Sequence, residues 1–350
     1  MRIGLTYWNK IDHLATTISN VLHKLGHDVI PFEASTCIPG QLDVILAYGP
    51  FGTLAPLGKQ LTSYAEATRP AFVLWLTEQL TNPRLPEWIQ VPISDARSKI
   101  EQISYHREED DQWDTNFLIK PLTSRANRFR YYGDIRWLHR EGVLTVLAVG
   151  SDWIANNLCE HGFEPITAYI GSHPDWYANL KLERDIPVLW LGKLVTHRRK
   201  ESLQQVRGDL QNRGVNLQVV DGVENPYIFG DERTKLLNRT KVIINLLRTE
   251  WDNHSLRFFL AIPNGCLVVS EPVFPHLPLV PGTHYVESPL DSMAERIIYY
   301  LNNEQERKVI VDRANQLITS ELTMENSIRK ILGKLPQNSR KKKWVKQNSI

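Results

Sequence analysis

The sequence has 350 residues, of which 42% are hydrophobic and 23% charged, and its formal net charge is +2. This length and composition predict two globular domains with ample apolar core, and the near-neutral charge argues against a nucleic-acid partner. No apolar run reaches the ~20 residues that a membrane-spanning helix needs. The three cysteines, Cys37, Cys159 and Cys266, lie far apart in the sequence and are typical of reduced residues, so we expect a cytoplasmic protein.

The first half of the chain alternates apolar runs with helical patterns, which predicts a parallel sheet covered by helices. Strands are expected at residues 2–7, 27–32, 42–48, 71–76, 143–149 and 165–170, with helices at residues 11–25 and 151–161. Loops at the carboxyl ends of parallel strands point to one crevice. The side chains expected to line that crevice are Asn9, Asp12, His13, Thr53 and Glu78.

Two polar segments of the first half allow alternative interpretations. The acidic run at residues 106–114 is either a metal-binding motif or a solvated loop, and charge runs usually face water, which favours the loop. Arginines interleave with aromatic residues at positions 123–140. Such a segment binds a polyanion or forms an amphipathic helix whose arginines reach solvent, and the near-neutral chain favours the helix.

The boundary between the two domains is predicted near residues 178–187, a polar stretch that ends at Pro187. The first domain is then residues 1–180 and the second residues 187–322. The second opens with a strand at 187–191, a basic loop at 197–200 and a helix at 201–210. Cations beside a helix N-terminus oppose its dipole, which favours an anionic ligand there. The candidates are Gly192, Lys193, Arg198, Arg199 and Lys200.

A further strand–turn–helix unit is expected at residues 242–262, and another strand at 266–269. The polar turn precedes a short apolar helix whose free N–H groups would point above the sheet, as in an anion site. Arg257 adds a positive charge in the first turn. The candidate ligand-binding residues of this segment are Asp252, Asn253, His254, Ser255, Leu256 and Arg257.

The C-terminal part is predicted to be helical at residues 291–302 and 304–320, with a last helix at 323–333 that crosses back to the first domain. The basic tail, residues 334–350, has a composition typical of disorder. It could instead touch an anionic membrane face through Lys341, Lys342, Lys343 and Trp344.

Several of these segments share one resemblance. The spacing of Asp252, Ser255, Leu256, Arg257, Phe259 and Gly265 resembles the donor-binding segment of GT-B glycosyltransferases of the group 1 type, closest to the spore-maturation (CgeB-like) branch. The glycine and basic residues at 192–200 are similar to the donor-phosphate motif of that family. One position departs from the pattern, because Leu260 stands where the family has a glutamate that holds the donor ribose.

The resemblance implies two Rossmann-like domains that face a cleft and a transfer of sugar from a UDP or GDP sugar to an acceptor without a metal cofactor. Arg199, Lys200 and Arg257 would hold the diphosphate, Tyr227 would meet the base, and Asp252 or Asn253 would bind sugar hydroxyls. His13 or Glu78 would be the base of an inverting reaction, although the resemblance leans towards retention.

Two other interpretations stay open at this point. Leu260 favours a non-catalytic scaffold or regulatory subunit of the same fold. A different doubly wound enzyme, such as a dehydrogenase, is disfavoured because no glycine-rich fingerprint follows the first strand.

Overall fold

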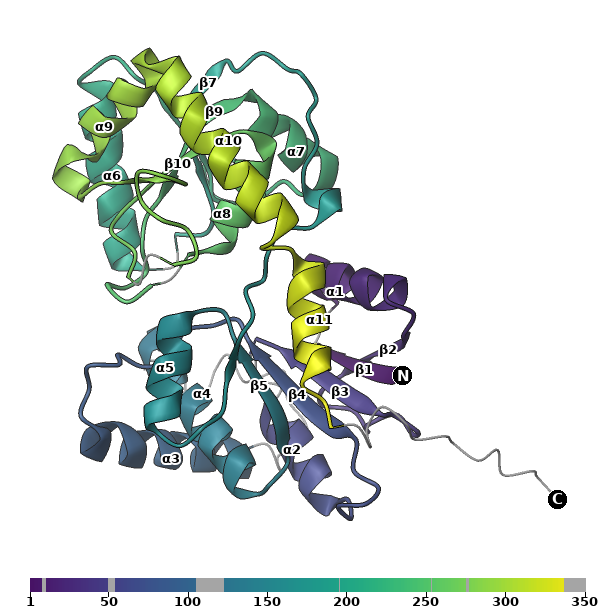
Figure 1. Ribbon diagram of the computed structural model, residues 1–350. Helices are drawn as coiled ribbons and strands as arrows, with labels where there is room; N and C mark the ends of the chain where they lie inside the picture. The colour runs from purple at the N-terminus through teal and green to yellow at the C-terminus, as the bar shows by residue number, and fades with distance from the viewer. Residues whose placement is uncertain are drawn as a thin grey trace. The chain divides into compact units, whose positions relative to one another are not determined.

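The computed structural model describes residues 1–7, 11–49, 54–104, 123–194, 196–252, 254–274 and 277–336 (Figure 1). The chain divides into two compact units. The N-terminal unit is Met1–Ala168 together with the C-terminal residues from Ile328, and the C-terminal unit is Tyr169–Ser327. Each unit has its own parallel sheet, which confirms the predicted fold class of two doubly wound α/β domains.

The sheet of the N-terminal unit has the strand order β2-β1-β3-β4-β5-β6, with every pair parallel. Its strands are β1 (Arg2–Tyr7), β2 (Asp28–Glu33), β3 (Val44–Tyr48), β4 (Ala71–Leu76), β5 (Leu144–Val149) and β6 (Ile166–Thr167). All residues of β3 and β4 are buried. Continuous apolar runs are typical of parallel strands covered on both faces, which is why these strands are readable from the sequence.

The helices described in this unit or reaching it are α1 (His13–Lys24), α2 (Leu54–Ser63), α3 (Glu87–Ser104), α4 (Thr123–Arg140), α5 (Asp152–Glu160) and α11 (Met324–Gly333). The predicted helix at 123–140 is confirmed, and its arginines pair with acidic residues of α3: Arg130 with Glu101 and Arg136 with Asp95. The sequence analysis did not predict α3 itself, which contains Pro92.

The sheet of the C-terminal unit is also entirely parallel, with the order β11-β10-β9-β7-β8. Its strands are β7 (Ile186–Leu191), β8 (Leu217–Val220), β9 (Thr240–Asn245), β10 (Leu267–Ser270) and β11 (Val286–Glu287). Its helices are η2 (Pro174–Trp176), α6 (His197–Gln211), α7 (Gly230–Arg239), α8 (Leu256–Ala261), η3 (Ile262–Asn264), α9 (Leu290–Asn302) and α10 (Glu304–Ser320).

The boundary between the units lies at residues 168 and 169, earlier than the predicted 178–187. Hydrogen bonds tie the intervening segment to the C-terminal unit: Asn264 Nδ2 donates to Trp176 O, the Leu180 N–H donates to Asn238 Oδ1, and Arg184 donates to Asn264 O. Polar composition suggested a linker here, but these side-chain contacts make the segment part of a domain. The predicted return of the chain to the first domain is confirmed, since residues from Ile328 belong to the N-terminal unit.

The two segments near the unit boundary are joined by a small set of backbone contacts. Ser172 N donates to Leu322 O at 2.9 Å, and Met324 N donates to Ser172 O at 2.9 Å. Gly171 beside them has φ +71°, and a Cβ added to it would lie 2.5 Å from the carbonyl carbon of Thr323. Only glycine fits this close backbone approach without strain.

We therefore expect Gly171→Ala to destabilise the protein by about 2–4 kcal/mol, because the left-handed conformation and the overlap with backbone atoms both cost free energy. Gly214→Ala is the matched control, since Gly214 has φ +75° and nothing within 4 Å of an added Cβ. The free energy of unfolding of this control should fall by only about 1–2 kcal/mol. Urea unfolding measures both, and equal losses would contradict the role given to Gly171.

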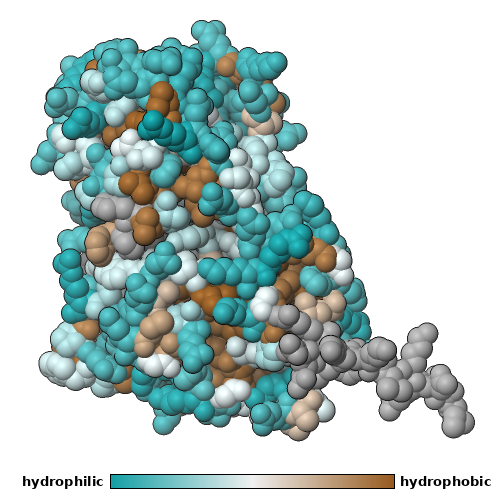
Figure 2. Space-filling view, in the orientation of Figure 1, coloured by the Kyte–Doolittle hydropathy of each residue, from teal (hydrophilic) through white to brown (hydrophobic). Residues whose placement is uncertain are grey.

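The face of the molecule drawn in Figure 2 carries hydrophobic residues in separate patches among hydrophilic ones. Within the described residues, no helix combines the length and apolar character needed to cross a membrane. The tail residues Lys341, Lys342, Lys343 and Trp344 lie outside the described part of the chain, as do Asn9, Thr53 and the acidic run at 106–114.

Candidate functional site: an arginine pair on a buried tryptophan

A buried tryptophan at the end of β7 forms the floor of the candidate site. The Trp190 side chain is fully buried, and its Nε1 donates to Gly192 O at 2.8 Å. Gly192 follows the strand with φ +144°, and a Cβ added there would lie 2.7 Å from Nη2 of Arg257. Glycine at this position therefore leaves room for the guanidinium group.

Arg257 lies in the first turn of α8 and is buried over the Trp190 ring, with its Cζ atom 4.2 Å from the ring centroid. Its Nε donates to Leu191 O at 2.9 Å, and its Nη1 donates to Asn245 Oδ1. The ring face attracts the cation, and the two acceptors fix the plane of the guanidinium group.

Arg199 approaches the same ring from α6, with its Cζ atom 5.5 Å from the Trp190 centroid. Its Nε donates to Leu246 O at 3.1 Å and its Nη1 to Lys193 O at 3.4 Å. The structure thus brings Arg199 and Arg257 together, although they come from two separate segments of the sequence. The sequence analysis expected these two arginines to meet. The helix begins earlier than predicted, because Thr196 caps it by accepting from the Arg199 N–H. The basic residues 197–200 form its first turn and not a preceding loop.

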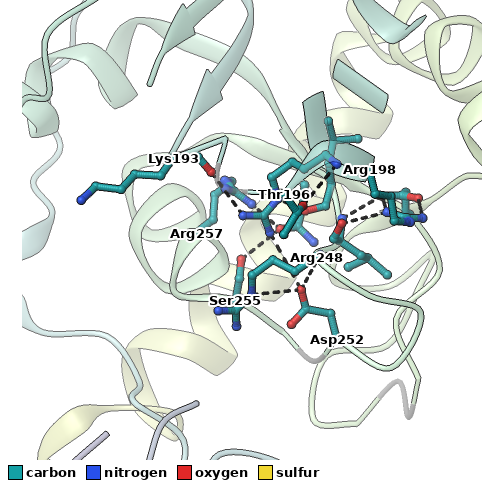
Figure 3. Close-up of polar contacts among 12 residues, drawn as sticks. Lys193, Thr196, Arg198, Arg248, Asp252, Ser255 and Arg257 are labelled. Carbon is teal, nitrogen blue, oxygen red and sulfur yellow. Dashed lines mark hydrogen bonds and ion pairs between the residues drawn. The ribbon is translucent and has the colours of Figure 1, made fainter. Parts of the chain in front are cut away.

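The carboxylate of Asp252 faces this cluster of cations (Figure 3). Oδ2 of Asp252 accepts from the Arg248 N–H at 2.7 Å, and it lies 3.5 Å from Arg248 Nε and 3.8 Å from Arg199 Nη2. Asp252 thus lies within ion-pair distance of Arg199 and Arg248, and Glu271 is a second carboxylate whose charge acts on Arg199. Burial, followed by repulsion from Arg199, lowers the pKa of Arg257 to about 9. Burial also lowers the pKa of Arg199, to about 10. A pocket with this surplus of buried positive charge favours an anion.

The predicted donor-binding residues divide into several groups in the structure. Gly192, Arg199, Asp252 and Arg257 belong to the arginine cluster. Ser255 joins it by donating to Asn245 Oδ1 at 2.9 Å, and Leu256 is the first residue of α8. Asn253 lies outside the described residues.

Arg198 and His254 have different surroundings from the arginine pair. Arg198 forms an ion pair with Glu271, and its Nη1 also donates to Leu247 O at 2.8 Å. The imidazole of His254 packs edge-on against the rings of Phe258 and Tyr285, with centroid distances of 5.0 and 5.6 Å. Both side chains therefore make contacts that support the local fold.

A cavity of about 700 Å³ opens beside the arginine cluster, between the start of α6 and the loop after β8. Lys193 and Lys200 are exposed cations on its lining, and Asp221 and Tyr227 form part of its wall. Lys193 Nζ lies 5.8 Å from the centroid of the Tyr227 ring. The sequence pointed to Lys193, Lys200 and Tyr227, and the structure places all three on one cavity.

Leu260 stands where the resembling family has a glutamate that holds the donor ribose. The Leu260 side chain is buried, and its carbonyl accepts from Asn264 Nδ2 at 2.8 Å. A ribose hydroxyl has no acceptor to bind on this side chain.

The two candidate bases lie in the N-terminal unit, at the carboxyl ends of β1 and β4. His13 is the exposed first residue of α1, which Asp12 caps by accepting from the Ala15 N–H at 2.7 Å. Glu78 follows β4 and is partly buried. Their strands are separated in the sheet only by β3. The catalytic roles of His13 and Glu78 stay predictions.

Five contributors to the site were not singled out from the sequence: Trp190, Asp221, Asn245, Arg248 and Glu271. Each stands at or within three residues of the end of a parallel strand, so the rule that sites form at carboxyl ends could have pointed to them. Most of their partners lie on other elements, and pairwise contacts across a sheet have no signal in the local sequence.

Comparison with known proteins supports the same architecture. Residues 198–333 match the model of a family described as glycosyl transferase-like, whereas no curated protein sequence matches the chain. Sucrose-phosphate synthase from Thermosynechococcus elongatus is similar in structure, with a TM-score of 0.57 and 11% identity over 97% of this chain and 98% of that one. HepE from Anabaena, in complex with UDP-glucose, gives a TM-score of 0.56 and 10% identity over 95% of this chain and 98% of that one.

The chain has the GT-B fold. TarM from S. aureus, in complex with Fondaparinux, alpha-GlcNAc-glycerol and UDP, matches with a TM-score of 0.55 and 11% identity. The GT-B chain described here covers 58% of the length of that TarM structure, and 92% of the present chain is aligned. In this GT-B chain the arginine cluster and the cavity both belong to the C-terminal unit.

Proposed function

We propose that this protein transfers a glycosyl group from a nucleoside diphosphate sugar to an acceptor. The observation that carries the proposal is the pair of buried guanidinium groups, Arg199 and Arg257, on the Trp190 ring, with Asp252 as the nearby carboxylate. A diphosphate bound there would supply the negative charge that the cluster lacks. Guanidinium forks match phosphate oxygens in shape as well as in charge.

The chemistry follows from where charge develops. When the bond between the sugar and the diphosphate breaks, negative charge grows on the leaving oxygen. Arg199 and Arg257 would stabilise that charge from positions fixed before the reaction begins. Because two cations fill this role, we propose that no divalent metal is needed. Lys193 and Lys200 on the neighbouring cavity would attract the nucleotide.

Further support comes from the similar proteins. The matching family is described as glycosyl transferase-like, and HepE was solved with UDP-glucose and with UDP. We propose that UDP sugars are the first donors to test, with GDP sugars as the alternative. If the reaction inverts the anomeric configuration, His13 or Glu78 would act as the base. A retaining reaction needs neither, and the resemblance of the donor segment favours retention.

The decisive experiment is a donor screen. Purified protein is incubated with UDP and GDP sugars, and release of the nucleoside diphosphate is followed with and without EDTA. We expect one donor to be hydrolysed or transferred at a rate that EDTA leaves unchanged and that Arg199→Met lowers. If no donor reacts and none raises the melting temperature, the proposed function is wrong.

A second candidate function is a non-catalytic GT-B subunit, and the buried Leu260 favours it. Such a protein would bind no nucleotide sugar or would bind one without turnover. The same screen separates the two, since binding without release of nucleoside diphosphate supports the subunit.

A further inference from the structure

Asp221 lines the cavity beside the arginine cluster, and it follows β8 at the position where doubly wound folds often have an acidic residue that binds a ribose. β7 and β8 are paired in parallel, with Leu191 opposite Val220. Gly192 and Asp221 therefore follow the two strands side by side, and the Gly192 N–H donates to Val220 O at 3.0 Å. In doubly wound folds the phosphates lie at the glycine turn after the first strand. An acidic residue further along the chain, at the end of the neighbouring strand, binds the ribose.

The hydrogen bonds of Asp221 leave one oxygen for a ligand. Its Oδ1 accepts from the N–H groups of Val223 and Glu224 at 2.8 and 2.7 Å, which closes the turn after β8. No hydrogen bond to Oδ2 occurs among the described residues, and Asp221 lines the cavity. The carboxylate is thus held rigidly by its own turn, while its second oxygen can accept from a ligand hydroxyl.

Tyr227 adds a second polar group to the same wall. Its ring rests on Gly222, where an added Cβ would lie 2.6 Å from Cε2. Its hydroxyl oxygen is buried and has no hydrogen-bond partner within the described part of the chain. Burial raises the pKa of Tyr227, the charge of Asp221 adds to the rise, and Arg257 and Arg199 oppose it. Tyr227 therefore lies close enough to the carboxylate and to the arginine pair to respond to their charges.

We propose that Asp221 binds the ribose hydroxyls of the donor, with the Tyr227 hydroxyl beside it, and that this site replaces the acceptor absent at Leu260. A ribose diol donates to Oδ2 of Asp221 and accepts from the Tyr227 hydroxyl, which satisfies a buried group that now has no partner. Glu224, the other acid on the cavity, is less suited because both its oxygens accept from Arg207, at 2.7 and 2.9 Å. This proposal rests on the proposed function, since it assumes a nucleoside diphosphate in this cavity.

The test measures ribose discrimination by calorimetry. UDP, 2′,3′-dideoxy-UDP and inorganic pyrophosphate are titrated into the wild-type protein and into Asp221→Asn. The amide keeps an oxygen for the turn, so the fold should persist, which melting temperatures check. We expect the wild type to bind UDP about 10- to 100-fold more tightly than the dideoxy analogue, as for a hydrogen bond to a charged group. Asp221→Asn leaves at most a neutral hydrogen bond to the ribose, so that ratio should fall below about 10, and pyrophosphate affinity should stay unchanged.

The control and the contrary outcomes separate the two proposals. Glu224→Gln, on the same cavity, should retain the full discrimination between the two nucleotides. Wild-type binding of UDP without discrimination, or discrimination that survives Asp221→Asn, would overturn the role of Asp221 and leave the proposed function standing. Failure of the wild type to bind any of UDP, GDP, ADP or CDP would overturn both.

Discussion

Replacing Arg257 by methionine is expected to weaken the binding of UDP about 10- to 100-fold, because a buried charge-assisted hydrogen bond to phosphate is lost. Methionine fills similar space over the Trp190 ring but carries no charge. The guanidinium group is buried beside Arg199, so water cannot take over its interaction with the ligand. Calorimetric titration of UDP measures the loss.

The stability of the Arg257→Met protein should be measured separately from its affinity. The substitution removes a cation whose burial is unfavourable, but it leaves Leu191 O and Asn245 Oδ1 without their donor. The UDP-dependent rise in melting temperature, which reports binding to the native state, should shrink whatever happens to the unliganded protein.

Arg239→Met is the matched control for this change. Arg239 belongs to the same unit and pairs with Asp185, but both side chains are exposed and lie outside the cluster. An exposed ion pair contributes little to stability and nothing to a distant site. Equal UDP affinity of Arg257→Met and Arg239→Met would refute the assignment of the diphosphate to the arginine cluster.

A large effect on stability is expected at Glu271, which follows β10 and is buried. Its Oε2 accepts from the Leu247 N–H at 2.7 Å and from Arg198 Nη1 at 3.0 Å. Glu271→Ala leaves the buried N–H without an acceptor and Arg198 without its counter-ion. We expect the free energy of unfolding to fall by about 2–4 kcal/mol. This is less than for a fully buried ion pair, because Arg198 is partly exposed. For a domain of this size the melting temperature should fall by about 5–15 °C.

The same substitution should also weaken UDP binding. Leu247 is adjacent to Leu246, whose carbonyl accepts from Arg199 Nε, so Glu271 holds the segment that positions one of the two arginines. Glu271→Gln retains an acceptor for the Leu247 N–H, so its stability and its UDP affinity should lie between those of Glu271→Ala and the wild type. Asp185→Ala, which removes the carboxylate of an exposed pair, should change stability little. A loss in Glu271→Ala no greater than in Asp185→Ala would contradict this account.

Local sequence was sufficient for most strands and for the location of the cationic segments. β4 is a run of six apolar residues, and a strand buried on both faces needs such a run, so its bounds were predicted without error. The start of α6 was predicted too late. Thr196 was not recognised as its cap, and the basic residues that follow were assigned to a loop. α3 was missed because Pro83 and Pro86, just before it, were interpreted as a loop and no helix was assigned to the residues that follow.

The sequence showed which residue types are available for the site, but it did not show which contacts each side chain makes. Arg198 and Arg199 are neighbours with the same chemistry. One turns to Glu271 and the other to the Trp190 ring, a difference decided by which strand each side chain faces. Asp252, expected to bind sugar hydroxyls, accepts from Arg248 and lies beside Arg199.

The sequence by itself determined two parallel α/β sheets and the two basic segments of the second, since strand burial, helix period and charge are properties of neighbouring residues. The tertiary structure alone decided that Arg199 and Arg257 share one aromatic ring, that Asp221 stands beside Gly192, and that residues 169–185 belong to the C-terminal unit. These facts depend on which strands pair and on contacts between residues far apart in the chain. Such contacts are set by the packing of the whole domain, and local periodicity carries no record of them.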